Sequence, residues 1–215
     1  MIFVLRSKVG HLASATVLAC ALSAPAAATT LDFSTNGTGN LGSYTSTFTV
    51  AGQSITAYGF EPGPSTVHLW YKAGGVGEMG LGLADDPQHE VLPGHFITLL
   101  MPTSFSRTYT LTLDSLQGPS KNMPAENASI YECKGSTGTN CQFMTKVSGP
   151  AVLDKSVTLT LDPLYSYFKI KDNDAAGGEN VLLESVSAVP LPAAAWLLLS
   201  GLGGLVMFGR RKRTA

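Results

Sequence analysis

Short runs of alternating apolar and polar residues fill the central part of the chain. In residues 108–113 and 156–161, Leu, Val or Tyr alternates with Thr or Ser, which gives a strand one apolar face and one hydroxyl face. Seven further runs of similar length predict strands over residues 44–50, 54–60, 66–72, 95–101, 128–133, 167–171 and 181–186.

Glycine and proline separate these runs, as in Gly74-Gly75, Pro93-Gly94 and Gly149-Pro150. No segment of the body shows a long apolar stripe with the 3.6-residue period of a helix. About nine strands in roughly 160 residues fit two packed sheets and one adequate core. The sequence therefore predicts an all-β body with a β-sandwich or jelly-roll-like architecture.

The N-terminus has the layout of a secretion signal. Arg6 and Lys8 precede residues 9–22, which are uncharged except for one histidine, and small residues up to Ala28 suit a signal peptidase. The pattern predicts a signal peptide over residues 1–28. Two alternatives remain open: an uncleaved anchor, for which the apolar run is short, and a lipoprotein signal with lipidation at Cys20.

The C-terminus combines an apolar segment with a basic cluster. Residues 185–209 carry no charge, and the 18 residues from 191 to 208 would span roughly 27 Å as a helix. A basic cluster follows at once: Arg210, Arg211, Lys212 and Arg213. Because basic residues stay on the cytoplasmic side, the pattern predicts one transmembrane helix with a cytoplasmic tail and an exported body.

A proline motif stands immediately before this segment: Val189, Pro190, Leu191, Pro192 and Ala193. Together with the apolar segment and the terminal basic cluster, it resembles the PEP-CTERM sorting signal in its VPLPA variant. Leu191 stands where the name-giving form has Glu. The resemblance implies that a membrane exosortase cleaves the chain near the motif, in a Gram-negative bacterium that makes exopolysaccharide. The alternative is a plain C-terminal anchor.

The segments divide the chain into a signal peptide (1–28), an exported β domain (29–187) and a C-terminal sorting signal (188–215). The whole chain has 14 basic and 15 acidic residues. Without the two basic residues near the N-terminus and the four at the C-terminus, eight basic residues face fifteen acidic ones, a net charge of −7. An acidic body argues against nucleic acid as a partner.

Cys133 and Cys141 flank a polar, glycine-rich segment of the body. An exported protein meets an oxidising compartment, which favours a disulfide, and the flexible segment allows its geometry. The alternative, a zinc site, would need two more ligands at suitable spacing. The sequence therefore predicts a structural disulfide.

Asp85, Asp86 and Glu90 form a weak candidate for a calcium site, because carboxylate oxygens in a loop suit this ion. The alternative is a solvated acidic turn, which we favour. No cofactor is therefore predicted.

Catalytic motifs are missing from the sequence: it has no nucleophile elbow, no phosphate loop and no His-Glu-x-x-His. A pair of carboxylates that hydrolyses glycosides depends on the fold and has no fixed spacing, so a sandwich-fold hydrolase remains an alternative. The chain is predicted not to be an enzyme.

Residues 66–72 alternate between two faces of a predicted strand. One face is the better core face: Val67, Leu69 and Tyr71. The other face carries His68, Trp70 and Lys72. An outward indole can stack on a sugar ring while its polar neighbours reach hydroxyl groups, so His68 and Trp70 are candidates for a glycan platform. The alternative is that a loop or the second sheet covers Trp70.

We expect an exported protein that is held briefly by its C-terminal helix and then released to the cell surface or extracellular matrix. Its partners would be an exosortase, signal peptidase and the secretion machinery. The expected role is structural or interactive and not enzymatic. A carbohydrate-binding module associated with exopolysaccharide is the alternative, and a hydrolase is the third hypothesis.

Overall fold

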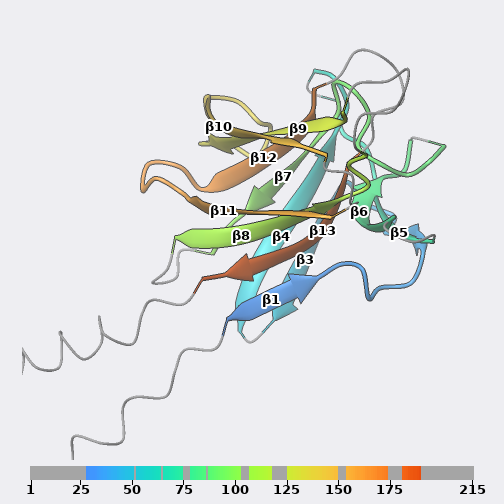
Figure 1. Cartoon of the computed structure of the whole chain (residues 1–215), viewed down its shortest axis with the longest axis horizontal. Helices are drawn as coiled ribbons and strands as arrows, with labels where there is room; N and C mark the ends of the chain where they lie inside the picture. Colours follow the sequence, from blue (N-terminus) through green and yellow to red (C-terminus); the bar gives the residue numbers. More distant parts are fainter. Residues whose placement is uncertain are drawn as a thin grey trace, which may run out of the picture. The chain divides into compact units, whose positions relative to one another are not determined.

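The computed structural model describes residues 28–50, 52–63, 65–74, 78–85, 87–102, 107–117, 125–149, 154–173 and 181–189. These residues form an all-β unit whose strands pair in two antiparallel sheets (Figure 1). The prediction of an all-β body is confirmed. Within the described ranges, no helix has the length and apolarity that a bilayer span requires.

The first sheet has seven strands in the order β11-β8-β13-β6-β5-β2, with β1 added to β13. Its strands are β1 (Thr29–Asp32), β2 (Gly39–Asn40), β5 (Leu69–Ala73), β6 (Met79–Leu83), β8 (Thr108–Asp114), β11 (Lys155–Thr160) and β13 (Leu182–Ala188). The second sheet has six strands in the order β10-β9-β12-β7-β4-β3. They are β3 (Thr45–Val50), β4 (Gln53–Phe60), β7 (Phe96–Leu100), β9 (Asn127–Cys133), β10 (Cys141–Ser148) and β12 (Tyr167–Asp172).

The core lies between the two sheets because each strand turns alternate residues inward. On β8, Tyr109, Leu111 and Leu113 are buried, whereas the threonines between them are partly exposed. Phe168 and Ile170 of β12 enter the same apolar cluster from the second sheet. The rings of Tyr109 and Phe168 meet edge to face at 5.9 Å. The sheets therefore pack face to face as a sandwich.

Each of the nine predicted segments overlaps a strand of the structure. Four strands were not predicted, and for two of them, β10 and β6, the physical reason is clear. β10 is an edge strand with a bulge between Phe143 and Thr145, which breaks its period of two. β6 alternates leucine with glycine, and a Cβ on Gly82 would lie 2.0 Å from the carbonyl oxygen of His89. The backbone of His89 comes so close that only glycine fits at Gly82, and glycine weakens the sequence signal for a strand.

The first and last strands of the described unit lie side by side (Figure 1). β1 pairs with β13 in antiparallel register, so that Thr29 faces Ala188. The backbone N–H of Val189 then donates to the carbonyl oxygen of Thr108 at 2.9 Å. The two ends of the folded unit therefore meet at one place.

Several predicted features lie outside the described residues. Of the predicted signal peptide over 1–28, only Ala28 is described, and of the predicted sorting motif only Val189 is. The rest of the motif and the basic cluster are outside: Pro190, Leu191, Pro192, Ala193, Arg210, Arg211, Lys212 and Arg213. The predicted membrane helix over 191–208 is outside as well.

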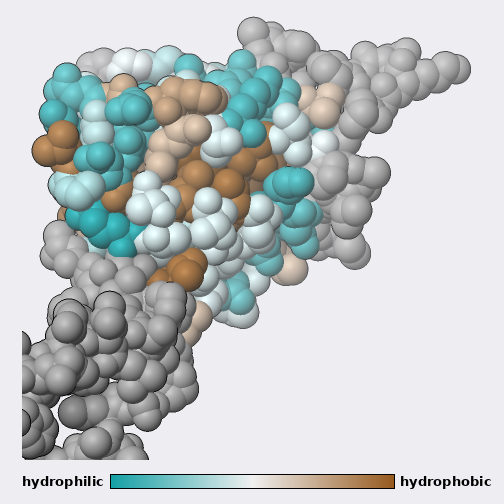
Figure 2. Space-filling model, turned by 60° about the vertical axis from the view of Figure 1, so that its left-hand side comes forward, coloured by the Kyte–Doolittle hydropathy of each residue, from teal (hydrophilic) through white to brown (hydrophobic). Residues whose placement is uncertain are grey.

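The surface of the sandwich is not uniformly polar. In Figure 2, hydrophobic residues form a patch near the centre of one face, among weakly polar and hydrophilic ones. The large apolar side chains with the highest exposure are Leu164 (73%), Phe143 (54%) and Tyr44 (42%). Exposed aromatic residues on a strand are candidates for binding, because water solvates them poorly.

Candidate functional site

The predicted platform around Trp70 has one ring face covered. As predicted, Val67 and Leu69 point into the core. His68 on the opposite face is exposed, but the indole of Trp70 stacks on the imidazole of His89, with ring centroids 3.7 Å apart and planes inclined by 17°. Trp70 is partly buried, and its Nε1 is buried with no hydrogen-bond partner among the residues that the structure describes. His89 therefore covers one face of the indole, and the platform at His68 and Trp70 stays a prediction.

Lys72, the third outward residue of this strand, is held by two glutamates. Its Nζ lies 3.0 Å from Glu78 Oε2 and also donates to Glu90 Oε1. Burial lowers the pKa of Lys72, but these two hydrogen bonds more than reverse the effect and raise it above its ordinary value. Burial raises the pKa of Glu90, which is 2% exposed and also accepts a hydrogen bond from Ser115. Lys72 is therefore a structural cation.

These residues line a cleft of about 640 Å³, which Glu126 also lines. Glu126 Oε2 accepts a hydrogen bond from the backbone N–H of Gln117 at 2.6 Å. Burial raises the pKa of Glu126, and the charges of Glu90 and Glu78 raise it further. Three carboxylates and one lysine make the cleft acidic, so it disfavours an anionic ligand.

The residues considered for calcium have separate partners. Asp85 Oδ2 lies 3.0 Å from His95 Nε2, whereas Glu90 bonds to Lys72. Asp86 lies outside the described residues. Within the part of the chain that the structure describes, no group of three His, Cys, Asp or Glu side chains could hold a metal ion.

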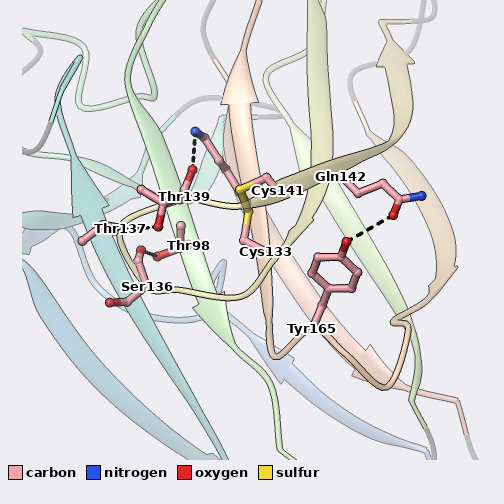
Figure 3. Close-up of a disulfide and its surroundings, with 10 residues drawn as sticks. Thr98, Cys133, Ser136, Thr137, Thr139, Cys141, Gln142 and Tyr165 are labelled. Carbon is pink, nitrogen blue, oxygen red and sulfur yellow. Dashed lines mark hydrogen bonds between the residues drawn. A yellow bond between two sulfur atoms is a disulfide. The ribbon is translucent and has the colours of Figure 1, made fainter.

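The predicted disulfide is confirmed: Cys133 and Cys141 are bonded, with Cα atoms 4.1 Å apart, and join the facing ends of β9 and β10. The loop that they close lies over the outer face of the second sheet (Figure 3). Thr98 Oγ1 on β7 donates to the carbonyl oxygen of Ser136. Gly138 has a φ of 64°, and a Cβ there would lie 2.8 Å from the Phe96 ring. Glycine is therefore required for this contact.

A row of outward side chains crosses five strands of the second sheet beneath this loop. The strand registers place side by side Phe143, Tyr131, Lys169, Thr98 and Tyr58. Lys169 in the middle donates to the carbonyl oxygen of Gly138 at 3.3 Å, and its Nζ lies 3.9 Å above the ring of Phe96. The loop therefore covers the middle of the row and leaves aromatic rings on both sides.

The two ends of the row carry separate aromatic pairs. Tyr131 and Phe143 meet edge to face, with centroids 5.5 Å apart, and Phe143 is the more exposed. Tyr58 and Tyr167 lie 6.3 Å apart at the other end. Burial raises the pKa of Tyr58, and the nearby hydroxyls of Tyr167 and Tyr44 add to it. We name Tyr58, Tyr131, Phe143 and Tyr167 the aromatic face.

The aromatic face was missed at the level of sequence. Tyr58, Tyr131 and Tyr167 all lie in predicted strands, at positions opposite to core residues. Marking every outward aromatic residue would have found them singly. Their gathering depends on the strand order β10-β9-β12-β7-β4, which joins segments far apart in the chain.

No protein-family model matches the chain, and no curated protein matches it. Among solved structures, the chain is similar to a xylan-binding module CBM15, with 14% sequence identity and a TM-score of 0.40. The match covers 69% of this chain and 95% of the module. Neither value is high enough to transfer a property, so the function has to be argued from the residues of this chain.

Proposed function

We propose that this chain is an exported, non-enzymatic protein that binds polysaccharide through the aromatic face of its second sheet. The observation that carries the proposal is the pair Tyr131 and Phe143, in which a phenylalanine on a strand is 54% exposed. A flat ring with open sides stacks on the C–H face of a sugar.

Polar groups on the same face suit the hydroxyl groups of a sugar. Lys169 is the cross-strand neighbour of Tyr131, and Lys146 lies further along β10 on the side of Phe143. Gln142 and Tyr165, which bond to each other at 3.2 Å, lie on the opposite face of β10, where Tyr165 packs against the core (Figure 3). Binding sites combine apolar platforms with a few oriented polar groups, and this end of the aromatic face has both.

The sorting part of the proposal rests on the two ends of the chain. The signal peptide would end at Ala28, and the exosortase motif would begin at Val189. The first strand begins at Thr29 and the last ends at Ala188, so the folded unit occupies the interval between the two segments. The mature protein would stay at the cell surface or in the extracellular matrix.

The binding proposal is tested by Phe143→Ala and Tyr131→Ala in the exported domain, with retention in gels that contain polysaccharide as the readout. Each variant should weaken binding about fivefold, which corresponds to about 1 kcal/mol for a lost stacking contact. Leu164→Ala is the matched control, because it removes an exposed apolar side chain outside the strands. Unchanged retention of both aromatic variants would contradict the proposal. Trp70→Ala in the same assay tests the indole, and loss of its stack on His89 should also lower stability.

The sorting proposal is tested by the intact mass of the mature protein from an exosortase-containing host. Cleavage is expected after Ala28 and at or beside residues 189–193. Replacing Pro190 and Pro192 with Ala should leave a membrane-bound, unprocessed form. Processing of this double variant at the wild-type rate would overturn the motif.

The non-enzymatic role is tested at the acidic cleft, where a hydrolase would have its carboxylates. Incubation of the protein with polysaccharide should release no reducing ends. Release that Glu126→Gln abolishes would identify an enzyme instead, since this change removes one buried carboxylate of the cleft.

A further inference from the structure

Positive charge gathers around the aromatic face, although the body as a whole is acidic. Seven lysine and arginine residues lie in the described part of the body. Four of them belong to β10, β12 or the disulfide-closed loop: Lys134, Lys146, Lys169 and Lys171. Lys146, Lys169 and Lys171 are outward residues of the aromatic face, whereas Lys134 lies over the ring of Tyr165.

The strand registers put three of these lysines next to Tyr131 and Phe143. Lys169 is the cross-strand neighbour of Tyr131. One row further along the same face, Lys146 and Lys171 flank Ser129 from opposite sides. Neighbouring strands are about 4.8 Å apart, and alternate residues are about 6.6 Å apart. One lysine therefore lies beside Tyr131 in its own row, and two lie in the next row of the same face.

No acidic residue opposes these cations on the described strands of the second sheet. The six strands contain two acidic residues, Glu132 and Asp172, and both are buried. Glu132 accepts a hydrogen bond from the backbone N–H of Asp162 at 2.9 Å. Among the described residues, none of the four lysines takes part in an ion pair. Burial lowers the pKa of Lys169, and the charge of Lys171 lowers it further, which indicates positive charge without local compensation.

From this arrangement we propose that the ligand of the aromatic face is an acidic polysaccharide, a chain with a carboxylate on its sugar rings. A ring would stack on Phe143 and Tyr131, and its carboxylates would lie near Lys146 and Lys171. Charge complementarity selects this class over a neutral chain, because a neutral ligand leaves the lysines without a partner. The inference rests on the proposed function and adds the chemical class of the ligand. The acidic cleft lined by Glu78, Glu90 and Glu126 disfavours the same ligand.

The test compares polygalacturonate with its methyl-esterified form, which has the same backbone without the charge. The readout is retardation of the exported domain in affinity gels at low salt and at 0.5 M salt. Wild type should bind polygalacturonate more tightly, and salt should weaken this binding because exposed charges are screened. Lys146→Gln and Lys171→Gln should each weaken it about threefold, as expected for an exposed ion pair. Neither change should affect the esterified form.

Lys155→Gln is the matched control, because Lys155 is an exposed lysine on β11 of the first sheet. It should leave both affinities unchanged. Equal, salt-independent binding of the two forms, or no effect of either lysine variant, would overturn the acidic ligand and leave polysaccharide binding in place. If the domain binds neither form, and binds none of a panel of other acidic polysaccharides and their neutral derivatives, the proposed function itself is overturned. As a folding control, each variant should have the same thermal unfolding midpoint as the wild type.

Discussion

The outer faces of the two sheets obey the same alternation and yet differ in chemistry. On the first sheet, the hydroxyls of β8 and β11 bond to each other in three cross-strand pairs: Thr108–Thr160, Thr110–Thr158 and Thr112–Ser156, each at 2.9–3.0 Å. On β9, β10 and β12 of the second sheet, the corresponding positions carry aromatic rings and lysines. The hydroxyl groups of the first face therefore bond to one another. The rings and lysines of the second face could contact a ligand instead. The apolar core is built from the inward positions, so the outward ones can differ between the two sheets.

The largest loss of stability is expected from a substitution in the core that the two sheets share. Phe168→Ala should lower the free energy of unfolding by about 3–5 kcal/mol, because it leaves a cavity where the ring meets Tyr109 between the sheets. Urea unfolding measures this loss, and Leu164→Ala should change it by less than about 0.5 kcal/mol. A loss below about 1 kcal/mol for Phe168→Ala would contradict a core shared by the two sheets.

The next largest effect is expected from the disulfide, which joins two strands of the second sheet and none of the first. Replacing Cys133 and Cys141 with Ser should lower the free energy of unfolding by about 2–3 kcal/mol through the entropy of the unfolded chain. It should also loosen the loop over Lys169 and Thr98 and change polysaccharide binding. Unfolding with and without reductant gives the first quantity. Alkylation of both thiols in the exported wild-type protein under non-reducing denaturation would contradict the bond.

The acidic side of the first sheet predicts a pH effect in the mildly acidic range. Burial and the nearby Asp154 raise the pKa of Asp114 to about 6 from 3.8, even though its carboxylate accepts hydrogen bonds from Met79 and Ser115. The folded protein then holds a proton that the unfolded chain has lost, so stability should fall as pH rises from about 4 to about 6. The expected change is on the order of 2 kcal/mol.

Urea unfolding at several pH values measures this change, and Asp154→Asn should reduce it by removing the neighbouring charge. Glu61→Gln is the control, since Glu61 lies outside this group. Stability that rises with pH over the same interval would refute the assignment to Asp114.

The smallest effect is expected in the hydroxyl pairs. Thr110→Val should cost less than about 1 kcal/mol, because it leaves Thr158 without its cross-strand partner near solvent. The double change of Thr110 and Thr158 to Val should be close to neutral, since β-branched pairs suit a strand. Binding of polysaccharide should not change in either variant. Weaker binding would show that the first face also takes part.

The comparison also shows how far the sequence could lead. Alternation in residues 108–113 predicts both the buried Leu111 and the outward Thr110, because a strand leaves no other choice. Two cysteines around a short glycine-rich segment predict their disulfide for a similarly local reason. Trp70 was placed on the outward face, but its partner His89 comes from a loop and has a φ of 61°. The aromatic face required the order of five strands, and pairing between distant segments leaves no trace in a single sequence.

The pairing of β1 with β13 has a mechanical consequence. Antiparallel strands pulled apart at neighbouring ends separate one residue pair at a time, as would happen to Thr29 and Ala188. A load that enters through the second sheet and leaves through Val189 instead pulls β13 along its length, against its ladders with β8 and β1. Those hydrogen bonds then have to break together. A body held at its C-terminal end would thus resist traction on a bound ligand better than traction on its own N-terminus.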